Sequence, residues 1–444
     1  MGTILGTIFA FVIVFGILVF VHEFGHFFMA KLMKVRVEVF SWGYGKRLFG
    51  FKKGETDYRV SLIPMGGYVK FSGEEAFDQE KKLAPHDFMA KKRWQRFLVL
   101  VMGSIMNIFL AVMLVFIISM VGVNIFEHLE QKPVIGWIEP GSPAERANLK
   151  IGDEILSINS KKTKTWSDVE LAVGIKPKRL IYLEVKRGDE VFRVKLMTES
   201  RTRLEMGYAG FFAEILTQAV MVIADSPAEK AGLKAGDVIL AINGEPVYFY
   251  HFVEIIEKNP EKELEFLAAR QGKTLTLHIT PRLEGKVGKI GIMSGMKSEV
   301  RKYGLFSAAA RSIKENMRLA FIIVNFIRDL IAGKASARQI GGPIEIANFS
   351  YAFFRMGFFA MMSFIAIISL QLGIINLFPI PVLDGGHILV LGLEGLFRRD
   401  FSLKIKQIVM QIGFVILIFL IVFVILNDVA RRLPNGWESF LFWK

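Results

Sequence analysis

The 444-residue sequence contains no cysteine, which excludes disulfide bridges and thiolate metal ligands. It also has no charged residue in the run from Gly2 to Val21. This run therefore lacks the basic segment that opens a signal peptide, and we expect it to be retained as a membrane span.

Long apolar runs account for the unusual composition of the chain. Hydrophobic residues make up 52% of it, with 40 phenylalanines, which places it outside the ordinary soluble class. Four runs approach or exceed the ~20 residues that an α-helix needs to cross hydrocarbon. They are Gly2–Val21, Phe97–Val123, Phe358–Phe378 and Ile408–Leu426. The sequence therefore predicts a polytopic α-helical membrane protein with four transmembrane helices.

The formal net charge of +14 would suit nucleic acid, but the distribution of the basic residues argues for a lipid bilayer. They gather beside the apolar runs, at Lys31–Lys53, Lys91–Arg96 and Arg398–Lys406. Basic residues that flank spans mark cytoplasmic loops. We therefore predict no nucleic-acid partner, an external N-terminus, two short cytoplasmic loops and an external central region.

The first run ends in the pentapeptide His22-Glu23-Phe24-Gly25-His26. In a helix, His22 and His26 project from one face and can both reach one Zn²⁺, while Glu23 can act on a water molecule as general base. Each ionisable side chain in a bilayer costs at least ~2.5–3.5 kcal/mol, so three together indicate a function. At ~1.5 Å per residue the preceding helix spans ~30 Å, which predicts a site near the cytoplasmic boundary.

A catalytic zinc site usually needs a third protein ligand, and the segment Asn376–His387 offers two. Pro379 and Pro381 should break the helix there and deliver Asp384 on the break. His387 is an equal rival on chemistry alone, and spacing cannot choose between them. Asp384 could also serve only to begin a turn with the two glycines that follow it.

The central region contains an internal repeat with an offset of 84 positions. Gly141–Asn159 matches Asp225–Asn243, and each copy reads as a short capped helix, a turn and a strand. The pattern resembles PDZ domains of the bacterial protease type, whose groove accepts a peptide as an added strand. The alternative is that both copies are spacers.

Between the first two spans, Val35–Ser72 alternates apolar and polar residues and is rich in glycine, which is typical of β-hairpins. The hairpin could fold on itself, or it could offer an edge strand to a substrate beside the metal, and we favour the second interpretation. In that case Gly43, Gly66 and Gly67 are candidate substrate-binding residues. Further along, Tyr303–Lys334 has the helical spacing of membrane-surface helices.

The chain resembles the site-2 protease family of intramembrane metalloproteases in three features. These are the pentapeptide His22–His26, the motif Asn-x-x-Pro-x-Pro-x-Leu-Asp-Gly-Gly that begins at Asn376, and the PDZ-like repeat between the two. The resemblance extends through Pro64–Lys70 and covers nearly the whole chain. It implies His22, His26 and Asp384 as zinc ligands, Glu23 as general base and Asn376 as a substrate-binding residue.

The resemblance also implies an enzyme of the bacterial inner membrane that cuts single-pass membrane proteins inside the bilayer. Its implied substrates are an anti-sigma factor already trimmed on its outer side and remnant signal peptides, with periplasmic PDZ-like domains as a filter. Two other functions would fit parts of the pattern. A non-catalytic PDZ adapter leaves the histidines and glutamate in the membrane unexplained, and a zinc transporter leaves the repeat unexplained.

The predicted segments in chain order are the first transmembrane helix (1–33), a membrane-associated β-hairpin region with a cytoplasmic loop (34–96), the second transmembrane helix (97–123), two tandem PDZ-like α+β domains (124–206 and 207–296), amphipathic interfacial helices (297–350), the third transmembrane helix (351–390), a cytoplasmic loop (391–406), the fourth transmembrane helix (407–430) and a tail (431–444).

Overall fold

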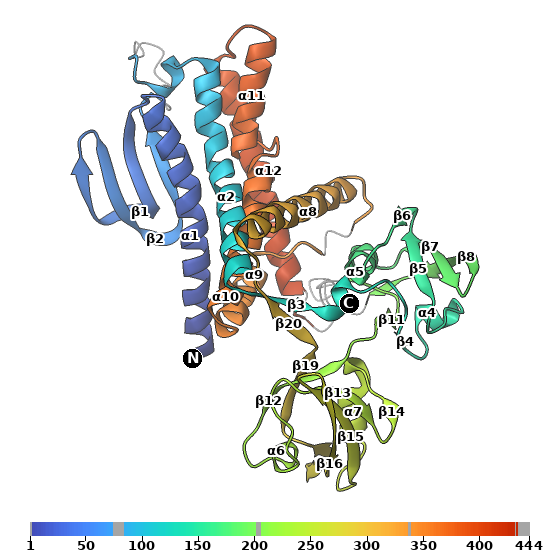
Figure 1. Ribbon diagram of the computed structural model, residues 1–444. Helices are drawn as coiled ribbons and strands as arrows, with labels where there is room; N and C mark the ends of the chain where they lie inside the picture. Colours follow the sequence, from blue (N-terminus) through green and yellow to red (C-terminus); the bar gives the residue numbers. More distant parts are fainter. Residues whose placement is uncertain (1, 74–83, 201–205, 336–338, 431, 434–444) are drawn as a thin grey trace, which may run out of the picture. The chain divides into compact units, whose positions relative to one another are not determined.

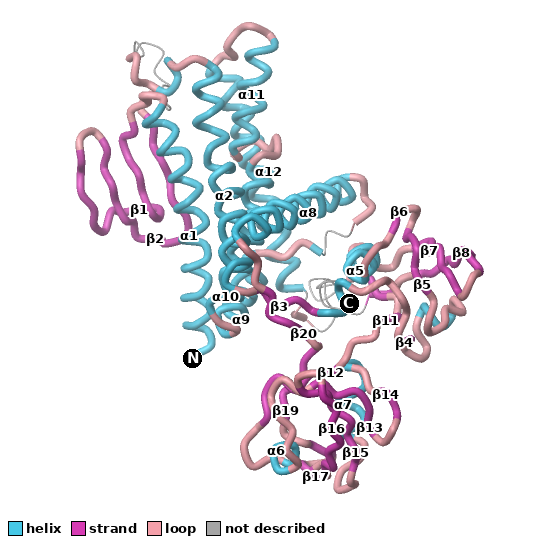
Figure 2. The backbone as a smooth tube through the Cα atoms, in the orientation of Figure 1, coloured by secondary structure: helices cyan, strands magenta, loops and turns pink. Residues whose placement is uncertain are grey.

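The computed structural model describes residues 2–73, 84–200, 206–335, 339–430 and 432–433. The chain forms two compact units, one of Met1–Val121 with Lys302–Lys444 and the other of Gly122–Arg301 (Figures 1 and 2). Most of the predicted tail (431–444) lies outside the described residues, and so do residues 201–205, next to the predicted boundary between the two PDZ-like domains.

The first unit contains the four predicted spans. Four described helices are long and apolar enough to cross a membrane: α1 (Gly2–Leu32), α2 (Arg93–Val121), α10 (Phe358–Asn376) and α12 (Leu403–Ala430). Only 11% of the apolar window of α12 is buried inside the protein, against 44% for α2. The α12 helix therefore leaves most of its surface for lipid, whereas α2 is packed between other helices.

Helices α1, α2 and α10 pack closely around a common core. Ala10, Val14 and Leu18 of α1 are buried with Leu110 of α2 and Phe364 of α10. Glycines allow the close approach of the backbones, as in many membrane helix pairs. A side chain at Gly25 would lie 2.5 Å from the carbonyl oxygen of Met102, and one at Gly373 would lie 2.9 Å from that of Ser104.

The predicted third transmembrane segment (351–390) is divided in the structure. Helix α9 (Pro343–Arg355) ends before α10 begins, and α10 stops at Asn376. A loop with two prolines follows, and the chain resumes as α11 (Asp384–Leu396), which the sequence interpretation had not separated. Proline cannot continue a helix, so the break falls where Pro379 and Pro381 were expected to place it.

The glycine-rich segment forms the expected hairpin, of β1 (Val37–Lys53) and β2 (Thr56–Phe71), beside α1 (Figure 1). The hairpin is bent, so that Val39 faces Asp57 on one side and Lys70 on the other. Residues 67–71 consequently form an outer strand, paired with residues 37–42 along one edge. Among the described residues no strand is paired with the other edge.

The segment predicted as interfacial helices (297–350) begins instead with a strand. β20 (Ser298–Arg301) pairs antiparallel with β3 (Val123–Phe126), so the chain leaves and re-enters the first unit through one short ladder. Helix α8 (Leu305–Ile331) follows, with Ala308, Ser312 and Asn316 buried and Phe306 exposed. Small buried residues let α8 lie close against α2, with the Ser312 hydroxyl donating to the carbonyl of Val112 at 2.6 Å.

The second unit contains two similar halves, one for each copy of the repeat. The first has the sheet β6-β5-β7-β8 (Lys161–Lys162, Glu154–Ile158, Leu180–Arg187 and Glu190–Met197) with helices α4 (Pro143–Arg146) and α5 (Trp166–Gly174). The second has the sheet β16-β15-β13-β12-β19 (Lys273–Ile279, Leu264–Arg270, Val238–Ile242, Thr217–Val222 and Ile292–Met296) with helices α6 (Pro227–Lys230) and α7 (Phe249–Glu257).

The repeated residues have the same local roles in both halves. Ser142 and Ser226 cap the short helices that begin at the following prolines. The buried Asp153 pairs with Arg187 at 2.7 Å, and the buried Asp237 pairs with Arg270 at 2.6 Å. Burial raises the pKa of Asp237, but the hydrogen bonds from Arg270 and from the backbone of Lys234, together with the positive charges of both residues, outweigh burial and hold the pKa below its ordinary value. The aspartate of the repeated Gly-Asp is therefore explained by an internal ion pair.

Candidate metal centre

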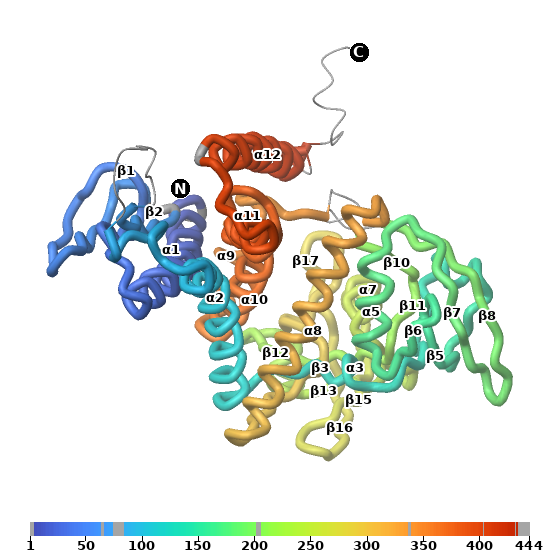
Figure 3. The backbone as a smooth tube through the Cα atoms, turned by 90° about the horizontal axis from the view of Figure 1, so that it is seen from above, coloured from blue at the N-terminus to red at the C-terminus, as the bar shows by residue number. Residues whose placement is uncertain are grey.

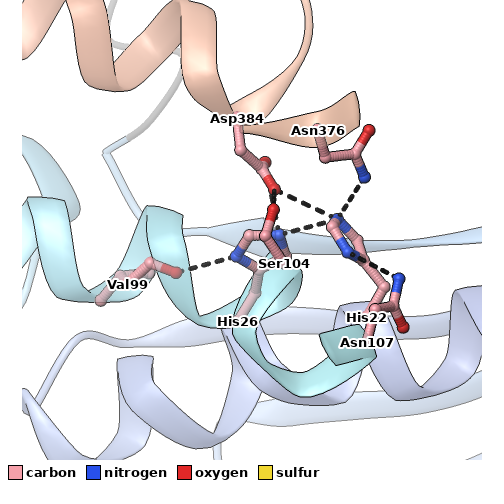
Figure 4. A network of polar contacts seen from close by, with 7 residues as sticks. All are labelled: His22, His26, Val99, Ser104, Asn107, Asn376 and Asp384. Carbon is pink, nitrogen blue, oxygen red and sulfur yellow. Dashed lines mark hydrogen bonds and ion pairs between the residues drawn. The ribbon is translucent and has the colours of Figure 1, made fainter. Parts of the chain in front are cut away.

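Helix α1 carries His22, Glu23 and His26 near its C-terminal end, and both imidazoles are buried on the face toward α2. Their Nε2 atoms lie 3.2 Å apart. Asp384, the first residue of α11, faces both rings, with Oδ2 3.3 Å from the Nε2 of His22 and Oδ1 3.4 Å from that of His26 (Figure 4). The structure thus brings Asp384 beside two histidines that precede it by more than 350 residues in the chain.

These distances fit a zinc ion. Four ligand atoms at ~2.0–2.1 Å from a tetrahedral Zn²⁺ would be separated from one another by ~3.3 Å. The three side chains satisfy this spacing and form the one His/Asp/Glu cluster of three or more with metal-binding geometry among the described residues. Two histidines and a carboxylate are also the ligand types of catalytic zinc sites that keep a position open. The residues present therefore fit zinc.

Outer contacts fix the orientation of the histidine rings, as they do in zinc enzymes. The Nδ1 of His26 donates to the carbonyl oxygen of Val99 at 2.8 Å, which leaves the Nε2 lone pair directed at the cluster. On the other ring, the Nδ1 of His22 lies 3.4 Å from the amide nitrogen of Asn107. The amide oxygen of this fully buried asparagine has no partner among the described residues. Rotating the amide by half a turn lets that oxygen accept the Nδ1 proton.

The carboxylate is positioned by a tight loop. Val382 has φ +82°, a left-handed conformation that is costly for a β-branched residue, and a side chain at Gly385 would collide with the carbonyl of Phe378. The loop therefore turns back on the end of α10 before α11 begins. Ser104 of α2 donates to Oδ2 of Asp384 at 3.3 Å.

A cavity of ≈ 460 Å³ opens at the cluster and is lined by the other predicted site residues except Gly43. Glu23, Asn376, Gly66 and Gly67 all line it. The amide nitrogen of Asn376 lies 3.4 Å from the Nε2 of His22. His387, the rival third ligand, also lines the cavity but lies outside the three-residue cluster.

Gly43 does not line this cavity and has a different place in the hairpin. Its carbonyl oxygen accepts a hydrogen bond from the Ser41 hydroxyl at 2.9 Å, and its φ is +94°. A side chain there would lie 2.8 Å from the carbonyl oxygen of Ile63. The described contacts of Gly43 are therefore those of a residue that shapes the hairpin.

The sequence interpretation missed the contribution of α2. Ser104 and Asn107 are fully buried polar residues inside an apolar run. Polar residues in a membrane span are costly unless they are paired, so the presence of Ser104 and Asn107 could have indicated a polar site beside α2. What the sequence did not show is that both face the metal cluster.

Gly103 of α2 provides a test of how tightly the cluster is packed. Its Cβ would lie 2.6 Å from Cε1 and 2.8 Å from Cδ2 of His26, a ring that the Val99 carbonyl holds in place. We expect Gly103→Ala to displace that ring, to lower the zinc content of the purified protein and to reduce the activity that depends on the metal by about 100-fold. Metal analysis and an activity assay measure the two effects.

Gly395→Ala is the matched control, because a Cβ at this other helical glycine meets nothing within 4 Å. It should keep full zinc content and activity. Equal zinc content and activity in the Gly103 and Gly395 variants would show that the His26 ring is free to move, contrary to the packing described here.

Comparison with known proteins gives consistent results over nearly the whole chain. A family model described as "Peptidase family M50" matches residues 10–420. A "Regulator of sigma E protease" of Salmonella typhi is 33% identical over 97% of this chain and 100% of its own length. The "Regulator of sigma-E protease RseP" of Escherichia coli (strain K12) is 33% identical, with 95% and 98% covered. A "Putative zinc metalloprotease" of Vibrio cholerae is 31% identical, with 97% and 100% covered.

Proposed function

Because the chain belongs to peptidase family M50, and is therefore a zinc-dependent intramembrane endopeptidase of the site-2 type, we propose that His22, His26 and Asp384 hold its zinc ion and that Glu23 is its general base. The observation that carries this proposal is the convergence of the three ligand atoms, all within 4.8 Å of one another, at the wall of a cavity that Glu23 also lines.

The roles of the side chains follow from their positions. When bound, zinc supplies a Lewis acid that polarises the scissile carbonyl and lowers the pKa of a water molecule. Glu23 accepts the proton of that water and returns it to the leaving amine. Asn376, with its amide nitrogen beside His22, is placed to donate to a substrate carbonyl. Val99 and Asn107 hold the tautomers of the two histidines.

We propose that the substrate binds as an added strand along the outer edge of residues 67–71, with which no strand among the described residues pairs. A peptide bond in a helix is shielded, so it must unwind before hydrolysis, and an added strand replaces the lost backbone hydrogen bonds. The edge lies beside the general base, since a side chain at Gly67 would be 3.3 Å from Cγ of Glu23. A side chain at Gly67 would also lie 2.8 Å from the carbonyl oxygen of Ser41, so glycine lets this strand approach both β1 and α1 closely.

The substrate class follows from the membrane location and from the names of the relatives. We propose that the protein lies in the bacterial inner membrane, with its active site near the cytoplasmic face and the unit Gly122–Arg301 in the periplasm. Relatives named as regulators of sigma-E suggest a pre-trimmed membrane-bound anti-sigma factor in the envelope stress response, and remnant signal peptides are a second substrate class.

This location is tested by mapping the cut that the purified protein makes in single-pass substrates. Mass spectrometry of the products should place the cut inside the transmembrane segment, in its cytoplasmic part. A cut in the soluble flank of the substrate would contradict the proposed depth of the site.

We propose that the two halves of the second unit are PDZ-like domains that exclude substrates with large outer domains. Their shared capping serines, buried ion pairs and sheets support a common domain type. Removing residues 127–297 and joining Phe126 to Ser298 through an Asn-Gly turn would preserve the β3–β20 ladder, because these two residues face each other.

We expect this deletion to raise cleavage of a substrate with an intact outer domain to the rate of its trimmed form. The two substrates are compared with the full chain and with the deletion variant in the same detergent. If the variant cleaves the trimmed substrate normally and still rejects the intact one, the filter lies elsewhere.

A further inference from the structure

A second cavity, of ≈ 680 Å³, adjoins the cavity of the metal centre. The two share Tyr68, Val69, Leu100 and His387. The remaining walls of the second cavity come from the end of β2, Phe88 and Met89, the first turn of α2, α11 and the beginning of α12. Figures 1 and 3 show the backbone of the labelled elements among these. The second cavity therefore lies between the catalytic cavity and the basic ends of α2 and α12.

Arg96 lines this cavity with hydrogen-bonding capacity that the protein leaves largely unused. The residue is 7% exposed, and its Nε has no partner among the described residues. One terminal nitrogen lies 3.8 Å from the sulfur of Met89 and the other 3.8 Å from a carboxylate oxygen of Asp400. Charge-assisted pairs normally close to ~2.7–2.9 Å, and Asp400 forms such a contact with Arg93 instead, at 2.9 Å.

The one acidic residue among those lining the cavity is already neutralised. Glu394 is 1% exposed and pairs with Lys406 at 2.6 Å. It also accepts a hydrogen bond from the backbone nitrogen of Phe401 at 2.9 Å. Because Lys406 and Glu394 cancel, Arg96 leaves a positive charge at the wall of the cavity, and a ligand group that complements it is an anion.

The outer strand of the hairpin runs along both cavities. Gly66 and Gly67 line the first cavity, Tyr68 and Val69 line both, and Lys70 lines the second. At ~3.3 Å per residue, a substrate strand added to this edge beside Glu23 reaches the second cavity within about two to four residues. Gln407 and Gln411, one turn apart on α12, line the same cavity and offer amide groups to an extended backbone.

We propose that the second cavity is a subsite for the substrate residues about two to four positions from the scissile bond, and that Arg96 gives it a preference for an acidic side chain. This inference rests on the proposed function, because it assumes that the substrate extends along residues 67–71. The occupant is the cleaved polypeptide itself, since the cavity adjoins the catalytic one and is lined by the same strand.

The test uses the full-length protein in detergent and pairs of single-pass substrates that differ by Glu or Gln at one position of the cytoplasmic flank. Scanning the positions from two to four, the wild type should cleave one Glu substrate with a kcat/KM about tenfold above its Gln partner, as expected for one charged hydrogen bond. In Arg96→Met the ratio should fall to about one. Lys92→Met removes an exposed positive charge one turn away and should keep the ratio.

Equal cleavage of the Glu and Gln substrates by the wild type at every position overturns the inference and leaves the proposed function intact, because both substrates are still cut. A second result would also overturn the inference. If phosphatidylglycerol in mixed micelles changes the cleavage rate of the wild type but not that of Arg96→Met, while the Glu-to-Gln ratio of kcat/KM stays at one, the cavity holds a lipid headgroup. Arg96→Lys keeps the charge and should retain part of the preference, which separates lost charge from a folding defect. A wild type that cuts neither substrate would count against the protease assignment itself.

Discussion

Glu23→Gln is expected to retain its zinc and to lose between 100-fold and 10,000-fold of its cleavage rate, roughly the range for removal of a general base. The amide has nearly the shape of the carboxylate but cannot accept the proton of the attacking water. The three proposed ligands are untouched, since Glu23 lines the cavity without belonging to the cluster. Zinc analysis and the rate of product formation are measured on the same preparation.

Glu38→Gln, which makes the same chemical change on strand β1, is the control and should behave as the wild type. Substantial cleavage by the Glu23 variant at full zinc content would remove Glu23 from the role of base. Loss of zinc together with activity would mean instead that Glu23 contributes to the metal site.

Asp384→Asn is expected to weaken zinc binding by at least ~10–100-fold, the effect seen when only an outer contact of a zinc site is removed, and to abolish cleavage at low free zinc. The amide carries no charge and replaces one carboxylate oxygen with a nitrogen that cannot coordinate, so the two histidines keep only a weak third ligand. Competition with a chelator of known affinity measures the change.

His387→Ala is the matched comparison, because His387 lines the same cavity and was an equal candidate on chemistry alone. The variant should retain zinc. If it loses zinc while Asp384→Asn keeps it, the third ligand has been assigned to the wrong residue.

The spans, the hairpin and the repeat could be predicted because each depends on a local pattern. A run such as Gly2–Val21 is long enough to need a bilayer, the alternation in Val35–Ser72 has the period of a strand, and the matched segments Gly141–Asn159 and Asp225–Asn243 repeat one unit. The prolines after Asn376 likewise predicted where α10 ends.

The arrangement around the metal centre could not be predicted, because it depends on contacts between distant segments. Nothing local indicates that the carbonyl of Val99 meets His26 or that Asn107 faces His22. Asp384 and His387 were equivalent in the sequence, and only the packing of α11 against α2 separates their positions. The double pairing of Val39, which makes residues 67–71 an outer strand of the hairpin, requires a bend that the alternation pattern does not encode.

The membership of peptidase family M50 favours an enzyme over the two other functions that the sequence left open. Both a PDZ adapter and a zinc transporter would preserve parts of the pattern, but the family match over residues 10–420 includes the two membrane motifs and the region between them. The side-chain geometry agrees with hydrolysis, because a general base and a three-ligand cluster line one cavity.

The central claim is that one zinc ion, held between α1 and α11, cuts a peptide bond inside the membrane. The most direct measurement incubates the purified protein in detergent with a single-pass substrate, first after treatment with a chelator and then after zinc is restored. Cleavage within the transmembrane segment should disappear with the chelator and return at about one zinc per chain, and Asp384→Asn should fail to recover under the same conditions. Cleavage that persists without zinc, or that does not return when zinc occupies the wild-type site, would contradict the account.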